Sequence, residues 1–190
     1  DGLLKKRIRF NEARTIANPV TIARVFESRR SDELVLLDIG KTVDEDDIDP
    51  YLISQIAEEL YMPFAYGGGI DSVEKMKNVI KNGAEKVVLN TAAFKNPALI
   101  TDGSKKFGSQ CIVVSIDALK KENNEYEVYI KSGSEPTGMD PVKWAKIVES
   151  YGAGEILLNS ILDEGTMNGY NLELIKMVSK AVKIPVIAMG

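Results

Sequence analysis

Two aspartates are the strongest candidates for acid–base chemistry. Asp38 and Asp117 each follow a short apolar run, at the point where a strand would end. The chain has no histidine and one cysteine, Cys111, which excludes Ser-His-Asp triads, Cys-His pairs and metal sites rich in histidine or cysteine. Proton transfer would then use carboxylates, lysine, tyrosine or water. We expect no metal and no cofactor, and from spacing alone each aspartate could equally cap the loop that follows it.

A run of glycines is the candidate for anion binding. Gly67, Gly68 and Gly69 stand between an apolar run and a helical pattern. Glycine lets backbone N–H groups approach a phosphate closely, and the N-terminus of the next helix adds positive potential. Asn90 and Thr91, at the following strand end, offer further donors. The glycines alone could form only a tight turn, but with these donors beside them they favour a phosphate site.

The elements that position these residues alternate along the chain. Nearly continuous apolar runs predict buried parallel strands at 33–39, 63–66, 86–90, 111–116, 155–159 and 185–188. Helical patterns lie between them, at 19–28, 50–60, 72–82, 96–107, 141–151 and 172–182. Three of these helices begin at a cap residue followed by proline, and residues 126–130 predict a short extra hairpin. This order implies a parallel sheet with helices outside, either a (βα)8 barrel or an open doubly wound sheet.

An internal repeat favours the barrel. Residues 19–68 match residues 141–190 at a constant offset of 122, without gaps. Examples are Pro19 with Pro141 and Glu33 with Glu155. If each half of the fold spans the 122 residues of the offset, two halves approach the about 250 residues of a (βα)8 barrel. We therefore expect a single α/β domain over residues 1–190, a TIM barrel with a half-barrel repeat, here incomplete with strands two to seven of eight.

Charged residues also stand at the opposite ends of three strands. Glu33, Lys86 and Glu155 each begin a predicted strand. Sequence alone favours solvated strand ends, and the sharper hypothesis is a ring of salt bridges around the barrel mouth.

The overall charge indicates which partners to exclude. The formal net charge is −4, from 24 basic and 28 acidic residues, which argues against general nucleic-acid binding despite a basic cluster at residues 5–9. No apolar run approaches the about 20 residues of a membrane span. We expect a cytoplasmic protein that binds neither nucleic acid nor membranes.

Four segments carry a resemblance to a known family. They read ELVLLDI at 33–39, YGGGI at 66–70, FGSQ at 107–110 and GAGEILL at 152–158. Together they resemble HisF, the cyclase subunit of imidazole glycerol phosphate synthase, over residues 1–190. The resemblance implies a lyase-type reaction of histidine biosynthesis, in which ammonia from a HisH-like glutaminase partner passes through the barrel. The implied substrate, a phosphoribulosyl aminoimidazole carboxamide ribonucleotide with two phosphates, becomes imidazole glycerol phosphate and aminoimidazole carboxamide ribotide.

The resemblance also implies roles for individual residues. Asp117 would be a catalytic aspartate on strand five, whose strand-one partner falls upstream of the chain, and Lys6 a functional lysine on the first loop. The implied substrate- and phosphate-binding residues are Asp38, Gly68, Gly69, Asn90, Thr91 and Gly165. Glu33, Lys86 and Glu155 would be three members of a charged gate that admits ammonia.

Departures from the family pattern keep an alternative open. Leu162 and Glu164 stand where the family has aspartates, Tyr66 replaces a small aliphatic residue, and Asn159 stands where threonine is common. Tyr66 and Asn159 resemble a HisF-like branch, the WbuZ type, which serves sugar amidation in surface-polysaccharide biosynthesis. Such a protein would act mainly as an ammonia conduit and partner. A third hypothesis is a non-catalytic scaffold that activates a glutaminase.

Overall fold

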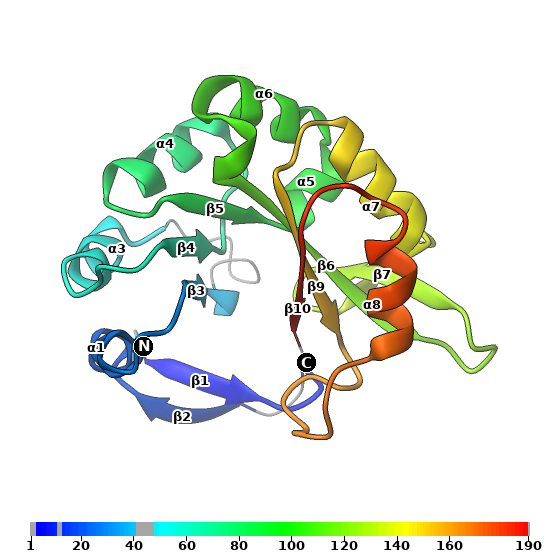
Figure 1. The fold of residues 1–190 in the computed structure, drawn as a ribbon, viewed down its shortest axis with the longest axis horizontal. Coiled ribbons are helices and arrows are strands. Elements are labelled where there is room, and N and C mark those ends of the chain that lie inside the picture. The colour runs from blue at the N-terminus through cyan, green and yellow to red at the C-terminus, as the bar shows by residue number, and fades with distance from the viewer. Residues whose placement is uncertain (1–2, 11–12, 41–47, 190) are drawn as a thin grey trace.

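A curled parallel sheet with helices on its outer side forms the centre of the molecule (Figure 1). The computed structural model describes residues 3–10, 13–40 and 48–189. Six parallel strands are hydrogen-bonded in chain order: β3 (Leu34–Leu37), β4 (Phe64–Gly67), β5 (Lys86–Leu89), β6 (Ile112–Lys120), β9 (Glu155–Ser160) and β10 (Val186–Met189). A doubly wound sheet would carry helices on both faces, so the arrangement is that of an incomplete (βα)8 barrel, as predicted.

The helices begin where the capping signals predict. They are α1 (Pro19–Ser28), α3 (Pro50–Ala57), α4 (Val73–Lys81), α5 (Thr91–Lys95), α6 (Ala98–Phe107), α7 (Pro141–Ser150) and α8 (Leu172–Ser179). The side chains of Asn18, Asp49 and Asp140 accept hydrogen bonds from the first free N–H groups of α1, α3 and α7. The predicted helix at 96–107 is wrong at its start, because Pro97 directly precedes α6 and a separate short helix, α5, follows Asn90.

One predicted strand also starts later than expected. Residues Ser109–Cys111 form a short 3-10 helix, η1, and β6 begins only at Ile112. Gly108, which precedes this turn, has φ 91°, a conformation that favours glycine. Cys111 therefore ends a turn rather than opening the strand.

The internal repeat is visible in the element bounds. Helices α1 and α7, helices α3 and α8, and strands β4 and β10 begin and end 122 residues apart. The two halves therefore share the local geometry that their sequences predict.

The sheet separates two apolar layers. The larger lies between the sheet and the helices and includes Phe64, Tyr66 and Trp144. The smaller is made by strand residues alone, with Ala65, Val88, Val113 and Leu157 buried and Val35, Leu37, Ile187 and Met189 partly buried. Because side chains alternate along a strand, residues two or four positions from the smaller layer also face the barrel interior. Lys86, Asn90, Asp117, Glu155 and Asn159 are in such positions.

Two antiparallel additions lie at the C-terminal ends of the parallel strands. Strand β7 (Tyr126–Ile130) pairs with the end of β6, as the predicted hairpin, and also with β8 (Glu135–Pro136). Strands β1 (Leu4–Arg7) and β2 (Ala13–Ala17) form a separate hairpin that the sequence analysis did not predict. The tip of this second hairpin reaches the loop after β9, since Arg9 donates from its backbone N to the Glu164 carbonyl at 2.9 Å and from Nε to the Leu162 carbonyl at 3.1 Å.

Candidate active site

Asp117 lies near the C-terminal end of β6 and is almost completely buried, with 8% of its surface exposed. Ser115 Oγ donates to its Oδ1 at 3.2 Å, and Asn90 Nδ2 donates to its Oδ2 at 3.2 Å. The side-chain amide of Asn159, in register with it on β9, also forms a hydrogen bond to the carboxyl group. Residues of three neighbouring strands therefore hold this one carboxyl group.

Burial changes the acidity of Asp117. Desolvation raises the pKa of this carboxyl from 3.8 to about 7, while the hydrogen bonds from Ser115, Asn159 and Asn90 lower it and the charge of Glu164 raises it. A carboxyl group that titrates near neutral pH can both accept and donate a proton at physiological pH. Asp117 thus has the properties of a general acid–base.

The glycine run forms a turn whose backbone conformation favours glycine. Gly68 has φ 122° and Gly69 has φ 66°. A Cβ atom on Gly68 would overlap the backbone carbonyl of Asp38, at the end of the neighbouring strand. The backbone N of Asp38 in turn donates to the Gly67 carbonyl at 2.7 Å. The turn therefore joins the ends of β3 and β4, and its role as a phosphate site stays a prediction.

The start of the next helix is partly occupied by its own side chains. Ser72 Oγ accepts from the backbone N of Lys75 at 3.3 Å and caps α4. Lys75 Nζ donates to the Gly69 carbonyl at 3.2 Å and lies 3.0 Å from Asp71 Oδ2. An ammonium group that is paired with Asp71 thus lies beside the glycine turn.

Asn90 and Thr91 are held by neighbours as well. Asn90 Nδ2 donates both to Asp117 and, at 3.1 Å, to the Ser115 carbonyl. Thr91 Oγ1 donates to Asn90 Oδ1 at 3.2 Å and accepts from the backbone N of Lys131 at 2.9 Å. The structure therefore brings Asn90 to the carboxyl group, and phosphate binding by this pair stays a prediction.

The remaining predicted residues lie in the loops at this end. Gly165, with φ 70°, follows β9 in a loop that Asp163 orders by accepting from Ser160 Oγ at 2.5 Å and from Asn171 Nδ2 at 3.1 Å. The backbone of Lys6 lies in β1, opposite Arg14. The side chain of Lys6 lies outside the described part of the structure, so its predicted role is not tested.

At the opposite end of the interior, the predicted salt bridges are present. Lys86 Nζ lies 2.8 Å from Glu155 Oε1 and 3.0 Å from Glu33 Oε1, with 17–26% of these side chains exposed. Burial alone would lower the pKa of Lys86, but the hydrogen bonds and charges of Glu155 and Glu33 together outweigh it and raise that pKa. The solvated-end interpretation is therefore wrong, and we call these three residues the lysine cluster.

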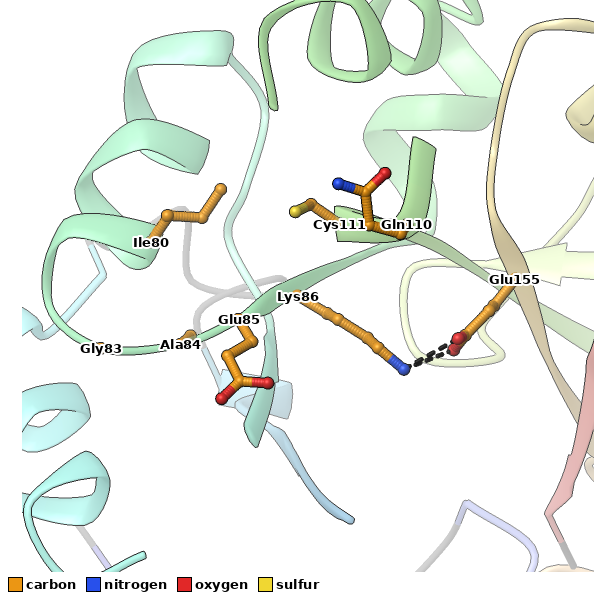
Figure 2. A pocket seen from close by; sticks show the side chains of 8 residues that line it. All are labelled: Ile80, Gly83, Ala84, Glu85, Lys86, Gln110, Cys111 and Glu155. Carbon is orange, nitrogen blue, oxygen red and sulfur yellow. Dashed lines mark hydrogen bonds and ion pairs between the residues drawn. The ribbon is translucent and has the colours of Figure 1, made fainter. Parts of the chain in front are cut away.

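A pocket of about 490 Å³ opens beside the lysine cluster. Figure 2 shows Lys86 extended along the pocket toward the carboxylate of Glu155. The other lining residues are Ile80, Gly83, Ala84, Glu85, Gln110 and Cys111. Lys86 and Glu155 of the lysine cluster thus form part of an accessible surface at the N-terminal ends of the strands.

Three residues surround Asp117 that the sequence did not assign to the site: Ser115 was not named, and Asn159 and Glu164 were named only as departures from the family pattern. Ser115 and Asn159 bond to its carboxyl group, and Glu164 raises its pKa. Ser115 could have been found, because it lies two residues before Asp117 and so shares its face of the strand. The approach of Glu164 to Asp117 depends on the path of the loop after β9, which the sequence does not predict.

Other kinds of site are not supported within residues 3–10, 13–40 and 48–189. In that part of the chain, no group of three or more Cys, Asp or Glu side chains is arranged to hold a metal ion. Over the same residues, none of the helices combines the length and the apolar character needed to cross a bilayer.

The chain is similar to known proteins of histidine biosynthesis. A family model described as "Histidine biosynthesis protein" matches residues 3–190. The imidazole glycerol phosphate synthase subunit HisF of Prochlorococcus marinus (strain MIT 9515) is 49% identical over 192 residues, which cover 100% of this chain and 75% of that protein. The HisF subunits of Hydrogenobaculum sp. (strain Y04AAS1) and Alkaliphilus metalliredigens (strain QYMF) are 45% and 43% identical, again over 100% of this chain and 75% of theirs.

Proposed function

The chain belongs to the HisF family of histidine biosynthesis proteins, and on that premise we propose that it is the cyclase subunit of an imidazole glycerol phosphate synthase. It is thus an enzyme subunit, and it works with a partner subunit. The proposed reaction is of the lyase type. Ammonia adds to the phosphoribulosyl aminoimidazole carboxamide ribonucleotide, and ring closure with cleavage gives imidazole glycerol phosphate and aminoimidazole carboxamide ribotide.

One observation carries the proposal. Asp117 is a buried carboxyl group with a pKa of about 7 at the C-terminal end of the barrel interior. In barrels of this kind, chemistry takes place at that end. In a chain without histidine, this group is the one best suited to move protons between ammonia, the substrate and the leaving group.

The lysine cluster supports the delivery of ammonia from the opposite end. Its ion pairs lie at the N-terminal ends of the strands, and the apolar inner layer around Val88, Val113 and Leu157 separates it from Asp117. A neutral molecule such as ammonia passes an apolar layer at far lower cost than an ion does. We therefore assign Glu33, Lys86 and Glu155 as the gate, with a HisH-like glutaminase as the partner that binds at this end.

The substrate carries two phosphates, and two sets of loops at the C-terminal end suit them. One set comprises Gly68, Gly69, Asn90 and Thr91, beside the ammonium group of Lys75. The other includes Gly165, in the loop after β9 that the β1–β2 hairpin contacts. Asp38 lies at the rim between β3 and the glycine turn, and Lys6 belongs to the hairpin. Asp38 and Lys6 would then act on the bound substrate from the C-terminal ends of the strands.

The test is turnover of the ribulosyl substrate by the full-length protein with an ammonium salt as the nitrogen source. We expect Asp117→Asn to lower kcat by about 100-fold or more, the usual contribution of a general acid–base. Asp102→Asn, at an exposed position on α6, is the control for loss of a charge. Full activity of Asp117→Asn with intact folding would refute the assigned role.

Full-length protein is needed because the sheet is open. Within the described residues, β3 and β10 form its two edges and pair with no further strand. Unpaired edges promote association between chains. We therefore expect a polypeptide of these 190 residues alone to be inactive and to associate.

The WbuZ-type alternative is not favoured. The relatives reported above are named as subunits of imidazole glycerol phosphate synthase. A protein of the alternative type would leave the ribulosyl substrate unchanged in the ammonium assay.

A further inference from the structure

Asn159 carries a buried oxygen that has no hydrogen-bond partner. The residue lies near the C-terminal end of β9, with 3% of its surface exposed, and its Oδ1 is unpaired in the described structure. Buried polar atoms are almost always paired, and an unpaired one costs folding stability. An exception beside a catalytic carboxyl group therefore calls for a functional explanation.

The position of Asn159 limits what the missing partner can be. Asn159 is in register with Asp117 on β6 and with Met189 on β10. Its amide forms a hydrogen bond to Asp117, so the N–H donors already serve the carboxyl group. The free Oδ1 can only accept, so the missing partner is a group that carries an N–H or O–H donor.

Among the residues that the structure describes, the neighbouring side chains do not supply this donor. Ser115 Oγ donates to Asp117, and Asn90 Nδ2 donates to Asp117 and to the Ser115 carbonyl. The interior layer below consists of aliphatic groups and methionine, such as Leu157, Ile187 and Met189, which donate no hydrogen bonds. Within the described residues no group donates to this Oδ1, so its partner lies outside those residues, and a small molecule that reaches this end of the interior can supply it.

We propose that Oδ1 of Asn159 is the acceptor that holds incoming ammonia beside Asp117. The inference rests on the proposed function, since it requires that ammonia reaches this end of the interior. Ammonia has three N–H groups and one lone pair, so a hydrogen bond through N–H leaves the lone pair free to attack the substrate. An amide oxygen is neutral and stabilises an ammonium ion less than a carboxylate does, so it favours the nucleophilic form. Asn159 thus contributes to binding of the nitrogen nucleophile.

The test compares two variants of nearly equal shape in the full-length protein. Asn159→Thr keeps an acceptor oxygen, and Asn159→Val replaces it with a methyl group. We expect KM for ammonia, measured with an ammonium salt, to be several-fold to about tenfold higher in Asn159→Val than in Asn159→Thr, the effect of one hydrogen bond. KM for the ribulosyl substrate should differ by less than about twofold between them.

Two outcomes would assign Asn159 a different role. If the oxygen binds the ribulosyl substrate, KM for that substrate will rise in Asn159→Val while KM for ammonia stays constant. If Asn159 only positions Asp117, both variants will lower kcat and shift the pH–rate profile together, with both KM values unchanged. Either result overturns the inference. Asn159→Leu, which matches asparagine in size, replaces the valine variant if that protein fails to fold.

The proposed function and this inference fail in different ways. If the wild-type protein does not convert the ribulosyl substrate with ammonium, the proposed function is wrong and the inference falls with it. If the wild type is active and the threonine and valine variants share one KM for ammonia, only the inference is wrong.

Discussion

Asn90 Nδ2 donates a hydrogen bond to Asp117 Oδ2 at 3.2 Å, and this bond joins the end of β5 to the end of β6. The same amide group donates to the Ser115 carbonyl at 3.1 Å. Asn90 is the proposed phosphate residue and Asp117 the proposed acid–base, so the two parts of the site share one side chain. Binding of a phosphate at Asn90 would therefore change the pKa of the Asp117 carboxyl group.

This coupling predicts the effect of Asn90→Asp on the pH–rate profile. The change removes a donor that lowers the pKa of Asp117 and adds a second carboxyl group beside it. Both effects raise the pKa of Asp117 above its present value of about 7. The limb of the kcat/KM profile that reports Asp117 should therefore move to higher pH. Thr91→Val, which removes the hydroxyl group bonded to Asn90 without adding charge, should leave that limb in place.

Asp117→Asn should make stability less dependent on pH. The folded-state pKa of about 7 exceeds the ordinary value of 3.8, so the native protein binds more protons than the unfolded chain between these values. Stability of the wild type therefore falls as pH rises through this window, and the loss is complete above the folded-state pKa. The stability of Asp117→Asn relative to wild type should rise between about pH 4 and about pH 7 and then stay constant.

Urea unfolding at about pH 5 and about pH 8 measures this difference. Asp102→Asn, at an exposed position, should change little relative to wild type between the two. An Asp117→Asn protein whose stability relative to wild type is the same at both pH values would show that this carboxyl group is not raised in pKa.

Lys86→Met should separate the two nitrogen sources. The change leaves Glu33 and Glu155 facing each other without the ammonium group between them, in a site that is only 17–26% exposed. We expect a loss of about 1–2 kcal/mol in the free energy of unfolding, between the values for exposed and buried pairs. Turnover with glutamine and the glutaminase partner should fall, because the change alters the gate and the surface to which the partner would bind. Turnover with saturating ammonium should change much less.

Lys120→Met is the matched control for this experiment. It also breaks an ion pair, with Glu173 at 2.7 Å, but on the outer side near β7. It should leave the ratio of glutamine- to ammonium-dependent turnover unchanged. Equal ratios in Lys86→Met and wild type would argue against the gate.

Gly68→Ala should disrupt the turn at the end of β4. Gly68 has φ 122°, and an added Cβ atom would overlap the backbone of Asp38, which cannot move without breaking the pairing of β3 with β4. We expect a loss of more than about 2 kcal/mol in thermal or urea unfolding, together with a higher KM for the phosphorylated substrate. Gly138→Ala is the control, since it has φ 71° and open space around it, and should cost only about 1 kcal/mol. Equal losses in the two variants would contradict the close approach to Asp38.

The fold was predictable from sequence where local signals and burial agree. Asn18, Asp49 and Asp140 begin helices as expected, because a cap residue before proline has few other conformations. The repeat predicted a barrel because it fixed the register of whole βα units. The β1–β2 hairpin was missed because its strands are short and largely polar, and its tip is held by contacts with Leu162 and Glu164 that are distant in sequence.

The site was predictable only in part. The positions of Asp38, Asp117 and the glycine turn follow from where the strands end. The pKa of Asp117 and the unpaired oxygen of Asn159 depend on desolvation and on which donors reach one carboxyl group. Those properties arise from packing between strands that are far apart in the sequence. No single segment of the sequence therefore predicts them.

The chain-order pairing of the parallel strands has a consequence for how the protein is made. From β3 to β10, each parallel pair joins strands that follow one another among the six as synthesis proceeds. A strand leaving the ribosome therefore meets an edge that is already present, and its connecting helix has only to cover the new face. Domains generally fold from the N-terminal side during translation, and here that order needs no strand to be inserted between two others. Growth of the sheet at one advancing edge also keeps the number of unpaired edges in this sheet at two, however many of its parallel strands have been made.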